Sequence, residues 1–406
     1  MEYQTYTLSN GIKLIHKPVK SPVAHAGIII NTGSRDEHEE EHGIAHFIEH
    51  MIFKGTKKRK AFHILSRLED VGGELNAYTS KEETCIYASF MKEDYQRAFE
   101  LISDIVFNSS FPDRELKKEK EVIIEEINSY LDQPGEQIFD DFEELIYKNA
   151  PIGRSILGTP EKLRKLTKNT LNRFIQQHYN TDQIIVCSVG NLSFSRLVKY
   201  FEKYFSNVPA TYRTWQRKKA GSYHPEIKII DKDTYQSHCI IGNRAYDLND
   251  KRRTDLHLLN NILGGQGLNS RLNLSLREKN GYAYNIESNY SPYFDTGVLS
   301  IYFGTDRKNL EKSINLTYKE FDKLKTKKLG EIQLARAKRQ ITGQLLRSSE
   351  INENLMLAIG KSYLVYGKVE TPEEINRKIE VITASGLMEI ANEILDTDQL
   401  SMLAYK

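Results

Sequence analysis

Four histidines recur at intervals of four residues, at positions 38, 42, 46 and 50. In an α-helix this spacing places side chains on one slowly drifting face, so the sequence predicts a helix over residues 39–53 that carries them. Two metal-binding patterns occur in the series. His38–His42 matches HExxH, and His46–His50 matches the inverted pattern HxxEH. Each pattern combines two imidazoles with a carboxylate, which is the chemistry of a catalytic zinc site.

The neighbours of the two patterns decide between them. Residues 36–41 read DEHEEE, so the first pattern lies in a run of acids without an apolar residue to bury it. A catalytic zinc ion needs a shaped, partly dry cavity, whereas the helix dipole favours a solvated, acidic helix start. We therefore place the metal at His46 and His50, although a solvated face is the alternative until a third ligand is identified. The apolar residues around this second pattern are Ile44, Ala45, Phe47, Ile48, Met51, Ile52 and Phe53.

A predicted helix over residues 112–130 provides the candidate for a third ligand. Catalytic zinc sites have three protein ligands and leave a position for water. Glu119 and Glu126 are seven residues apart and share a helical face. Glu126 is the candidate ligand, because on such a face one carboxylate can bind the metal while the other orients a ligand histidine. Taken alone, this acidic helix is more often a solvated surface.

The order of predicted elements repeats between the two halves of the chain, as two strands, two helices, a hairpin and further helices. Residues 208–223 are polar and basic and read as a linker, so the sequence predicts two domains, residues 1–210 and 224–406. The predicted fold class is α+β, with two homologous domains that each have a mostly antiparallel sheet and helices packed on one face. Strands are expected at 5–8, 12–16, 23–30, 74–78, 84–91, 184–189, 227–230, 238–242, 282–290 and 298–304, and further helices at 61–71, 194–205, 256–263 and 270–279.

Composition and charge argue against several other classes of protein. Basic and acidic residues number 57 and 55, and a net charge of +2 gives no reason to expect nucleic acid or an anionic membrane as a partner. We expect neither a membrane span nor a signal peptide at the N-terminus. The three cysteines, Cys85, Cys187 and Cys239, have no CxxC spacing, which argues against disulfides and a thiolate metal site. A cytoplasmic location is the simplest expectation.

Further segments make the chain similar to a known family. His46–His50 continues into Met51–Thr56, the Glu-x6-Glu pattern ends at Glu126, Asn76–Thr79 follows a double glycine, and Leu276–Tyr284 carries an arginine and a tyrosine. Over nearly its whole length the chain resembles the pitrilysin/insulinase family of inverted-motif zinc peptidases. Within this family it most resembles the branch of mitochondrial processing peptidase and its compact bacterial relatives.

The resemblance implies a role for each residue around the metal. His46, His50 and Glu126 would bind one Zn²⁺ ion per chain. Glu49 would be the general base that deprotonates the zinc-bound water, and Glu119 would support the ligands from behind. This assignment agrees with general chemistry, because zinc acidifies its water and polarises a carbonyl while a nearby carboxylate moves the proton.

The resemblance also implies how substrate is held. Asn76, Ala77 and Tyr78 would form an edge strand to which an extended peptide adds through backbone hydrogen bonds. Arg277 and Tyr284, in the second domain, would contact the substrate and help to stabilise the tetrahedral oxyanion, for which a guanidinium and a phenol are suitable donors. An ordinary hairpin strand is the alternative for residues 76–79.

The resemblance finally implies an assembly and leaves one rival function. Single-chain members of the family use four such domains to enclose a cavity, so a two-domain chain implies a homodimer. The expected function is that of a zinc endopeptidase acting on short or unfolded peptides. The rival is a non-catalytic structural or partner subunit, which in this family typically loses part of the metal motif or the Arg/Tyr pair. This chain retains both, at His46–His50 and at Arg277 and Tyr284.

Overall fold

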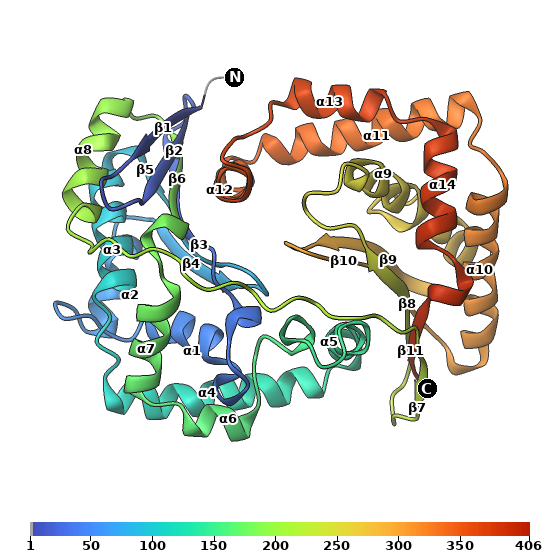
Figure 1. Cartoon of the computed structure of the whole chain (residues 1–406), viewed down its shortest axis with the longest axis horizontal. Helices are drawn as coiled ribbons and strands as arrows, with labels where there is room; N and C mark the ends of the chain where they lie inside the picture. The colour runs from blue at the N-terminus through green and yellow to red at the C-terminus, as the bar shows by residue number, and fades with distance from the viewer. Residues whose placement is uncertain (1–2) are drawn as a thin grey trace. The chain divides into compact units, whose positions relative to one another are not determined.

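The computed structural model describes residues 3–406, which form two compact units (Figure 1). The first unit contains the chain up to Ile127 together with Ser155–Lys218 and Arg347–Thr371, and the second contains Asn128–Arg154, Lys219–Leu346 and Pro372–Lys406. The first predicted domain begins at residues 1 and 2, which lie outside the described residues, as does the start of the segment in which no signal peptide is expected. Within residues 3–406, no helix combines the length and apolar character needed to cross a membrane.

The first unit is built on a six-stranded sheet with the order β1-β2-β6-β3-β5-β4. Its neighbouring strands are antiparallel except for the parallel pair β2 and β6. Strand β4 therefore lies at one edge and has β5 as its neighbour in the sheet. The strands are β1 (Gln4–Thr7), β2 (Lys13–Pro18), β3 (Val23–Ile30), β4 (Glu74–Thr79), β5 (Thr84–Met91) and β6 (Ile184–Gly190).

The sheet of the second unit repeats this connectivity. Its order, β7-β11-β8-β10-β9, matches β2-β6-β3-β5-β4 strand for strand, including one parallel pair at the same place. This agreement is the structural counterpart of the repeat that the sequence predicts. The strands are β7 (Ile227–Ile230), β8 (Ser237–Ala245), β9 (Ala283–Pro292), β10 (Gly297–Thr305) and β11 (Ser401–Tyr405).

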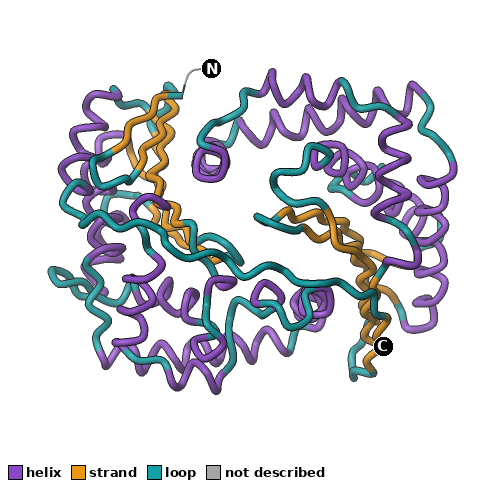
Figure 2. The backbone as a smooth tube through the Cα atoms, in the orientation of Figure 1, coloured by secondary structure: helices purple, strands orange, loops and turns teal. Residues whose placement is uncertain are grey.

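Helices cover both faces of the first sheet. One face, with Leu14 and Ile28, packs on α1, α2, α3 and α8 in the main core. The opposite face, with Ile29 and Cys187, packs on Met356 of α12. Figures 1 and 2 show the backbone of α12 apart from the other helices of this unit. The helices are α1 (Ile44–Met51), α2 (Ala61–Glu69), α3 (Tyr95–Phe107), α4 (Asp113–Leu131), α6 (Pro160–Lys165), α7 (Lys168–His178), α8 (Phe194–Phe205) and α12 (Asn352–Tyr366).

The second sheet is covered in the same way. Its main core faces α9, α10 and α14, and its other face packs Ile240 and Leu403 on Phe142 of α5. The α+β class is confirmed, with one further helix on the second face of each sheet. That helix comes from the other half of the sequence in both units. The remaining helices are α5 (Pro134–Ile146), α9 (Arg253–Gly264), α10 (Leu310–Thr326), α11 (Glu331–Ser349), α13 (Pro372–Glu380) and α14 (Ala384–Ile394), with a single π-helical turn at Asn273–Glu278.

The predicted helix over residues 39–53 is wrong at its start. Helix α1 begins only at Ile44, and Glu39–Glu41 forms a separate 3₁₀ turn. Gly43 interrupts the helix because its backbone is left-handed, with φ of 93°. A Cβ at this position would lie 2.9 Å from the Cα of Gly158, so the close approach of two backbones requires glycine here. The four histidines therefore do not share one helical face.

Candidate metal centre

Helix α1 is anchored at its start by a buried carboxylate. Glu37 accepts hydrogen bonds from the backbone N–H groups of Gly43 and Ala45, both at 2.9 Å. These N–H groups belong to the first turn, where a helix has no internal acceptors and where negative charge is favoured. The acidic stretch before the helix thus fixes the position of the residues that follow it.

Two imidazoles of α1 meet one carboxylate of α4. His46 Nε2 lies 3.9 Å from Glu126 Oε1, and His50 Nε2 lies 3.5 Å from Glu126 Oε2. Ligand atoms bound tetrahedrally to zinc at about 2.1 Å lie about 3.4 Å apart. The two distances to Glu126 are therefore close to those around a zinc ion. Within residues 3–406, this is the one group of three or more His, Cys, Asp and Glu side chains whose ligand atoms lie within 4.8 Å of one another.

The ring of His46 is neutral at ordinary pH. Burial, with a smaller contribution from the nearby His50 ring, lowers the pKa of His46 to about 3. The His46 side chain is 10% exposed and that of Glu126 is 42% exposed, so the carboxylate is the more open of the two to solvent. A neutral imidazole is the form that binds a metal, and no proton must be displaced from His46.

A second carboxylate, that of Glu119, binds the Nδ1 atom of the His50 ring. Glu119 Oε1 accepts a hydrogen bond from His50 Nδ1 at 2.9 Å, which leaves the Nε2 lone pair for a metal. Lys54 Nζ lies 2.8 Å from the other Glu119 oxygen. Burial alone would raise the pKa of Glu119, but the hydrogen bonds from His50 and Lys54 hold it below its usual value. Glu119 is therefore a buried, ionised support for the ring.

Glu49 lies on α1 between His46 and His50 in the sequence, but its carboxylate forms a hydrogen bond with another element. Its Oε2 accepts a hydrogen bond of 2.6 Å from the hydroxyl of Thr79, the last residue of β4. Burial raises the pKa of Glu49 above the usual value, and the hydrogen bonds from Thr79 offset part of that increase. A half-buried carboxylate with a raised pKa beside a metal site is suited to accepting a proton.

The remaining predicted residues fall in two places. Asn76, Ala77 and Tyr78 lie on β4, at the edge of the first sheet and next to α1. Arg277 and Tyr284 belong to the second unit, on the π-helical turn and on β9, where the guanidinium carbon lies 4.7 Å from the centre of the tyrosine ring. Tyr284 is 79% exposed.

The HExxH copy forms no comparable site. His38 is exposed, and His42 Nε2 lies 2.7 Å from the backbone carbonyl oxygen of Ser155. Glu41 is buried and paired with Arg173. Because α1 begins after these residues, the pattern has the right spacing in sequence but not the helical geometry that the spacing assumes.

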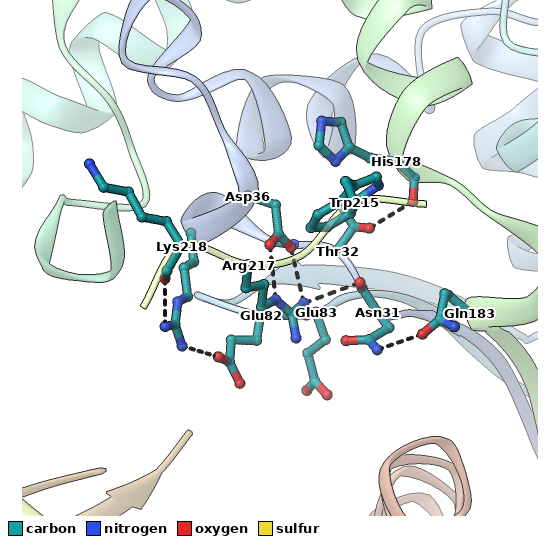
Figure 3. A network of polar contacts seen from close by, with 12 residues as sticks. Asn31, Thr32, Asp36, Glu82, Glu83, His178, Gln183, Trp215, Arg217 and Lys218 are labelled. Carbon is teal, nitrogen blue, oxygen red and sulfur yellow. Dashed lines mark hydrogen bonds and ion pairs between the residues drawn. The ribbon is translucent and has the colours of Figure 1, made fainter. Parts of the chain in front are cut away.

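A buried ionic network supports the same region from outside the site. Figure 3 shows Arg217 between Asp36 and Asn31, with Glu82 nearby. The Arg217 guanidinium donates to both oxygens of Asp36, at 2.9 and 3.0 Å, and to the backbone carbonyl of Glu82 at 2.6 Å. Arg35 forms an ion pair of 2.5 Å with the Glu82 carboxylate. The stretch that reads as a linker in the sequence is thus anchored to the first unit at Arg217.

Sequence reasoning did not identify Lys54, Glu37 or the contact between Thr79 and Glu49. Lys54 lies after the end of α1 at Met51, so helical spacing gives no signal for it. Glu37 caps a helix whose start was misplaced by five residues. The hydrogen bond between Thr79 and Glu49 joins a strand to a helix thirty residues away in sequence. No local sequence pattern predicts it.

Comparison with known proteins gives consistent matches. The family model described as insulinase (peptidase family M16) matches residues 13–160, and the one described as peptidase M16 inactive domain matches residues 165–341. A Bacillus subtilis (strain 168) protein named uncharacterized zinc protease YmxG is 35% identical over 97% of this chain and 96% of its own length. An uncharacterized zinc protease of Rickettsia felis is 36% identical over 96% and 94%.

Two solved structures share the fold. A peptidase M16 inactive domain from Pseudomonas fluorescens superposes with a TM-score of 0.92 at 20% identity, covering 100% of this chain and 98% of its own. A protease from Helicobacter pylori gives a TM-score of 0.89 at 21% identity, with coverage of 100% and 99%.

Proposed function

The chain belongs to the insulinase family of M16 peptidases, and from this premise we propose that it is a zinc-dependent endopeptidase that hydrolyses short or unfolded peptides. The observation that carries the proposal is the convergence of His46, His50 and Glu126 with Glu49 beside them. Two imidazoles and a carboxylate are a donor set suited to one catalytic zinc ion. Its relatives named zinc proteases accord with this choice of metal.

Each side chain has a separate task in the proposed reaction. A zinc ion held by His46, His50 and Glu126 would acidify a water molecule and polarise the scissile carbonyl. Glu49 accepts the proton of the attacking water and passes it to the leaving amine. Glu119 holds the ring of His50 with its Nε2 toward the metal.

Substrate contacts come from both sequence halves in this proposal. Strand β4, with Asn76, Ala77 and Tyr78, offers unpaired backbone groups at a sheet edge to which an extended peptide can add. Arg277 and Tyr284 supply a cation and a hydroxyl for the oxyanion of the tetrahedral state. Their contact with one another keeps the two groups oriented together.

Strand addition predicts a preference that one polypeptide in two states can test. We expect a small disulfide-bonded domain to be cleaved after reduction and alkylation and to resist cleavage while oxidised and folded, because only the unfolded chain presents an extended backbone. Mass spectrometry of the products measures the extent of cleavage of the reduced and of the oxidised domain. The same digestion with a Glu49→Gln enzyme controls for contaminating proteases. Comparable cleavage of the folded domain at an internal strand would refute strand addition.

The rival function, a non-catalytic subunit, has less in its favour. The match described as an inactive domain covers residues 165–341 and does not contain His46–His50 or Glu126. The chain retains the complete metal-binding set and the Arg277–Tyr284 pair, which a purely structural role does not require.

We further propose that the active unit is a homodimer in the cytoplasm. The three cysteines, Cys85, Cys187 and Cys239, are unpaired and buried, as suits a reducing compartment. The homodimer rests on the four-domain assembly of the family's single-chain members.

Mixing two inactive variants tests the dimer. If Tyr284 serves the partner's metal site, Glu49→Gln and Tyr284→Phe chains are expected to regain activity when mixed, since one site of the mixed dimer then carries neither change. If Tyr284 serves its own chain's site, each site keeps one change and activity stays low. Cleavage assays after subunit exchange measure the difference. A chain that is fully active as a monomer in sedimentation experiments would contradict the dimer.

A further inference from the structure

We propose that Thr79 is a positioning residue that orients the Glu49 carboxylate for proton transfer, so that the edge strand β4 controls the base as well as the substrate. This inference rests on the proposed function of the site. The supporting observation is the hydrogen bond of 2.6 Å from the Thr79 hydroxyl to Glu49 Oε2. That length is typical of a hydroxyl bound to an ionised carboxylate.

Glu49 needs an external support because its own helix does not provide one. A glutamate side chain has three rotatable torsions and loses much conformational freedom when it is held in one orientation. The hydroxyl of Thr79 fixes one carboxylate oxygen, Oε2, in place. Misplacing a catalytic group by about 1 Å can cost roughly 100-fold in rate, so a single well-placed donor matters.

Thr79 is itself held by the hairpin that it ends. It pairs with Thr84 across the strands β4 and β5, and the Thr84 hydroxyl donates to the carbonyl oxygen of Thr32 at 2.8 Å. The next residue, Ser80, donates its N–H to Glu83 at 2.8 Å and closes the turn. The β-branched side chain of Thr79 has few rotamers, so the backbone position largely fixes the hydroxyl.

The same turn is bound to the segment that leads into α1. The N–H groups of Ser34 and Arg35 donate to the carbonyl oxygens of Ser80 and Lys81, at 3.1 and 2.8 Å. Gly33 permits this approach, since a Cβ there would lie 2.3 Å from the Ser80 oxygen. The strand that carries Thr79 and the segment before the helix that carries Glu49 are therefore joined by backbone hydrogen bonds.

Buried charges strengthen this joint (Figure 3). Arg217 binds the carboxylate of Asp36 on one side and the carbonyl of Glu82 on the other. Asp36 precedes Glu37, whose carboxylate caps α1. Both partners of the Thr79–Glu49 hydrogen bond are thus attached to one buried framework, which is the arrangement expected of a preorganised pair.

The test uses purified zinc-loaded enzyme and an unstructured peptide substrate. Thr79→Val keeps the β-branched shape and removes the hydroxyl, so we expect kcat to fall about 10- to 100-fold, with KM changed less than about twofold and zinc content unchanged. Thr79→Ser restores the hydroxyl and should recover most of kcat. Thr7→Val, on the exposed edge strand β1, is the matched control and should behave as wild type.

The outcomes separate this inference from the proposed function. If Thr79→Val has the kcat of wild type while Glu49→Gln is inactive, Thr79 does not position the base and the inference is wrong. Equal losses in Thr79→Val and Thr79→Ser would also overturn it, because the hydroxyl would then be irrelevant. Thr79→Ala provides the same comparison if the valine variant does not fold. A Glu49→Gln enzyme as active as wild type would instead refute the proposed function.

Discussion

A Glu49→Gln variant is expected to lose about 10²–10⁴-fold in kcat while it keeps its zinc. The amide has nearly the shape of the carboxylate and can still accept the hydrogen bond from Thr79. It cannot accept a proton from water, so only the proton transfer is removed. His46, His50 and Glu126 are untouched, and metal binding should therefore persist.

A matched variant distinguishes this loss from a general effect of removing charge near the metal. Glu125 is exposed on α4, next to the proposed ligand Glu126, and Glu125→Gln should retain nearly full activity. Peptide cleavage and zinc content are measured for both variants. Near-normal cleavage by Glu49→Gln would rule out this residue as the base.

Elements with strong local signals were predicted well from the sequence. Strands β3 and β5 and helix α8 have the predicted limits, because a continuous apolar run or a helical period with clear ends defines each of them. The start of α1 was misplaced because acidic residues and a four-residue histidine spacing look helical. The helix begins only after Gly43, whose backbone is left-handed. Gly158 packs closely against Gly43, and no local sequence pattern reveals this contact.

Several elements are missing from the predicted order, among them α3, α5 and β11. In the sequence, Pro134 and Gly135 resemble the end of a helix, whereas in the structure they begin α5. Proline is well tolerated in a first helical turn, so the same residues fit both interpretations. Strand β11 lies between β7 and β8, which are more than 150 residues away in sequence, and its place depends on long-range pairing.

The residues of the candidate site also differ in whether a local sequence pattern predicts them. The spacing of His46, Glu49 and His50 within one helix was readable because it is local. Glu126 and Glu119 needed the family resemblance, since a helical acidic face alone does not show what it packs against. The geometry of the Thr79 contact with Glu49 depends on a strand and a helix meeting, so it required the structure.

The second large effect expected is on metal binding. His46→Ala removes one of the three proposed ligands at a buried position, and we expect zinc affinity to fall by more than the roughly 100-fold that losing a supporting residue can cost. Cleavage should fall with it. His38→Ala changes a histidine of the HExxH copy, which is exposed and lies outside α1, so zinc affinity should not change.

The zinc content of purified wild-type, His46→Ala and His38→Ala chains tests the central claim most directly. After dialysis against a weak chelator, we predict about one zinc ion per chain in wild type and His38→Ala, and little or none in His46→Ala. Zinc retained by His46→Ala but lost from His38→Ala would contradict the assignment of the metal to the HxxEH motif.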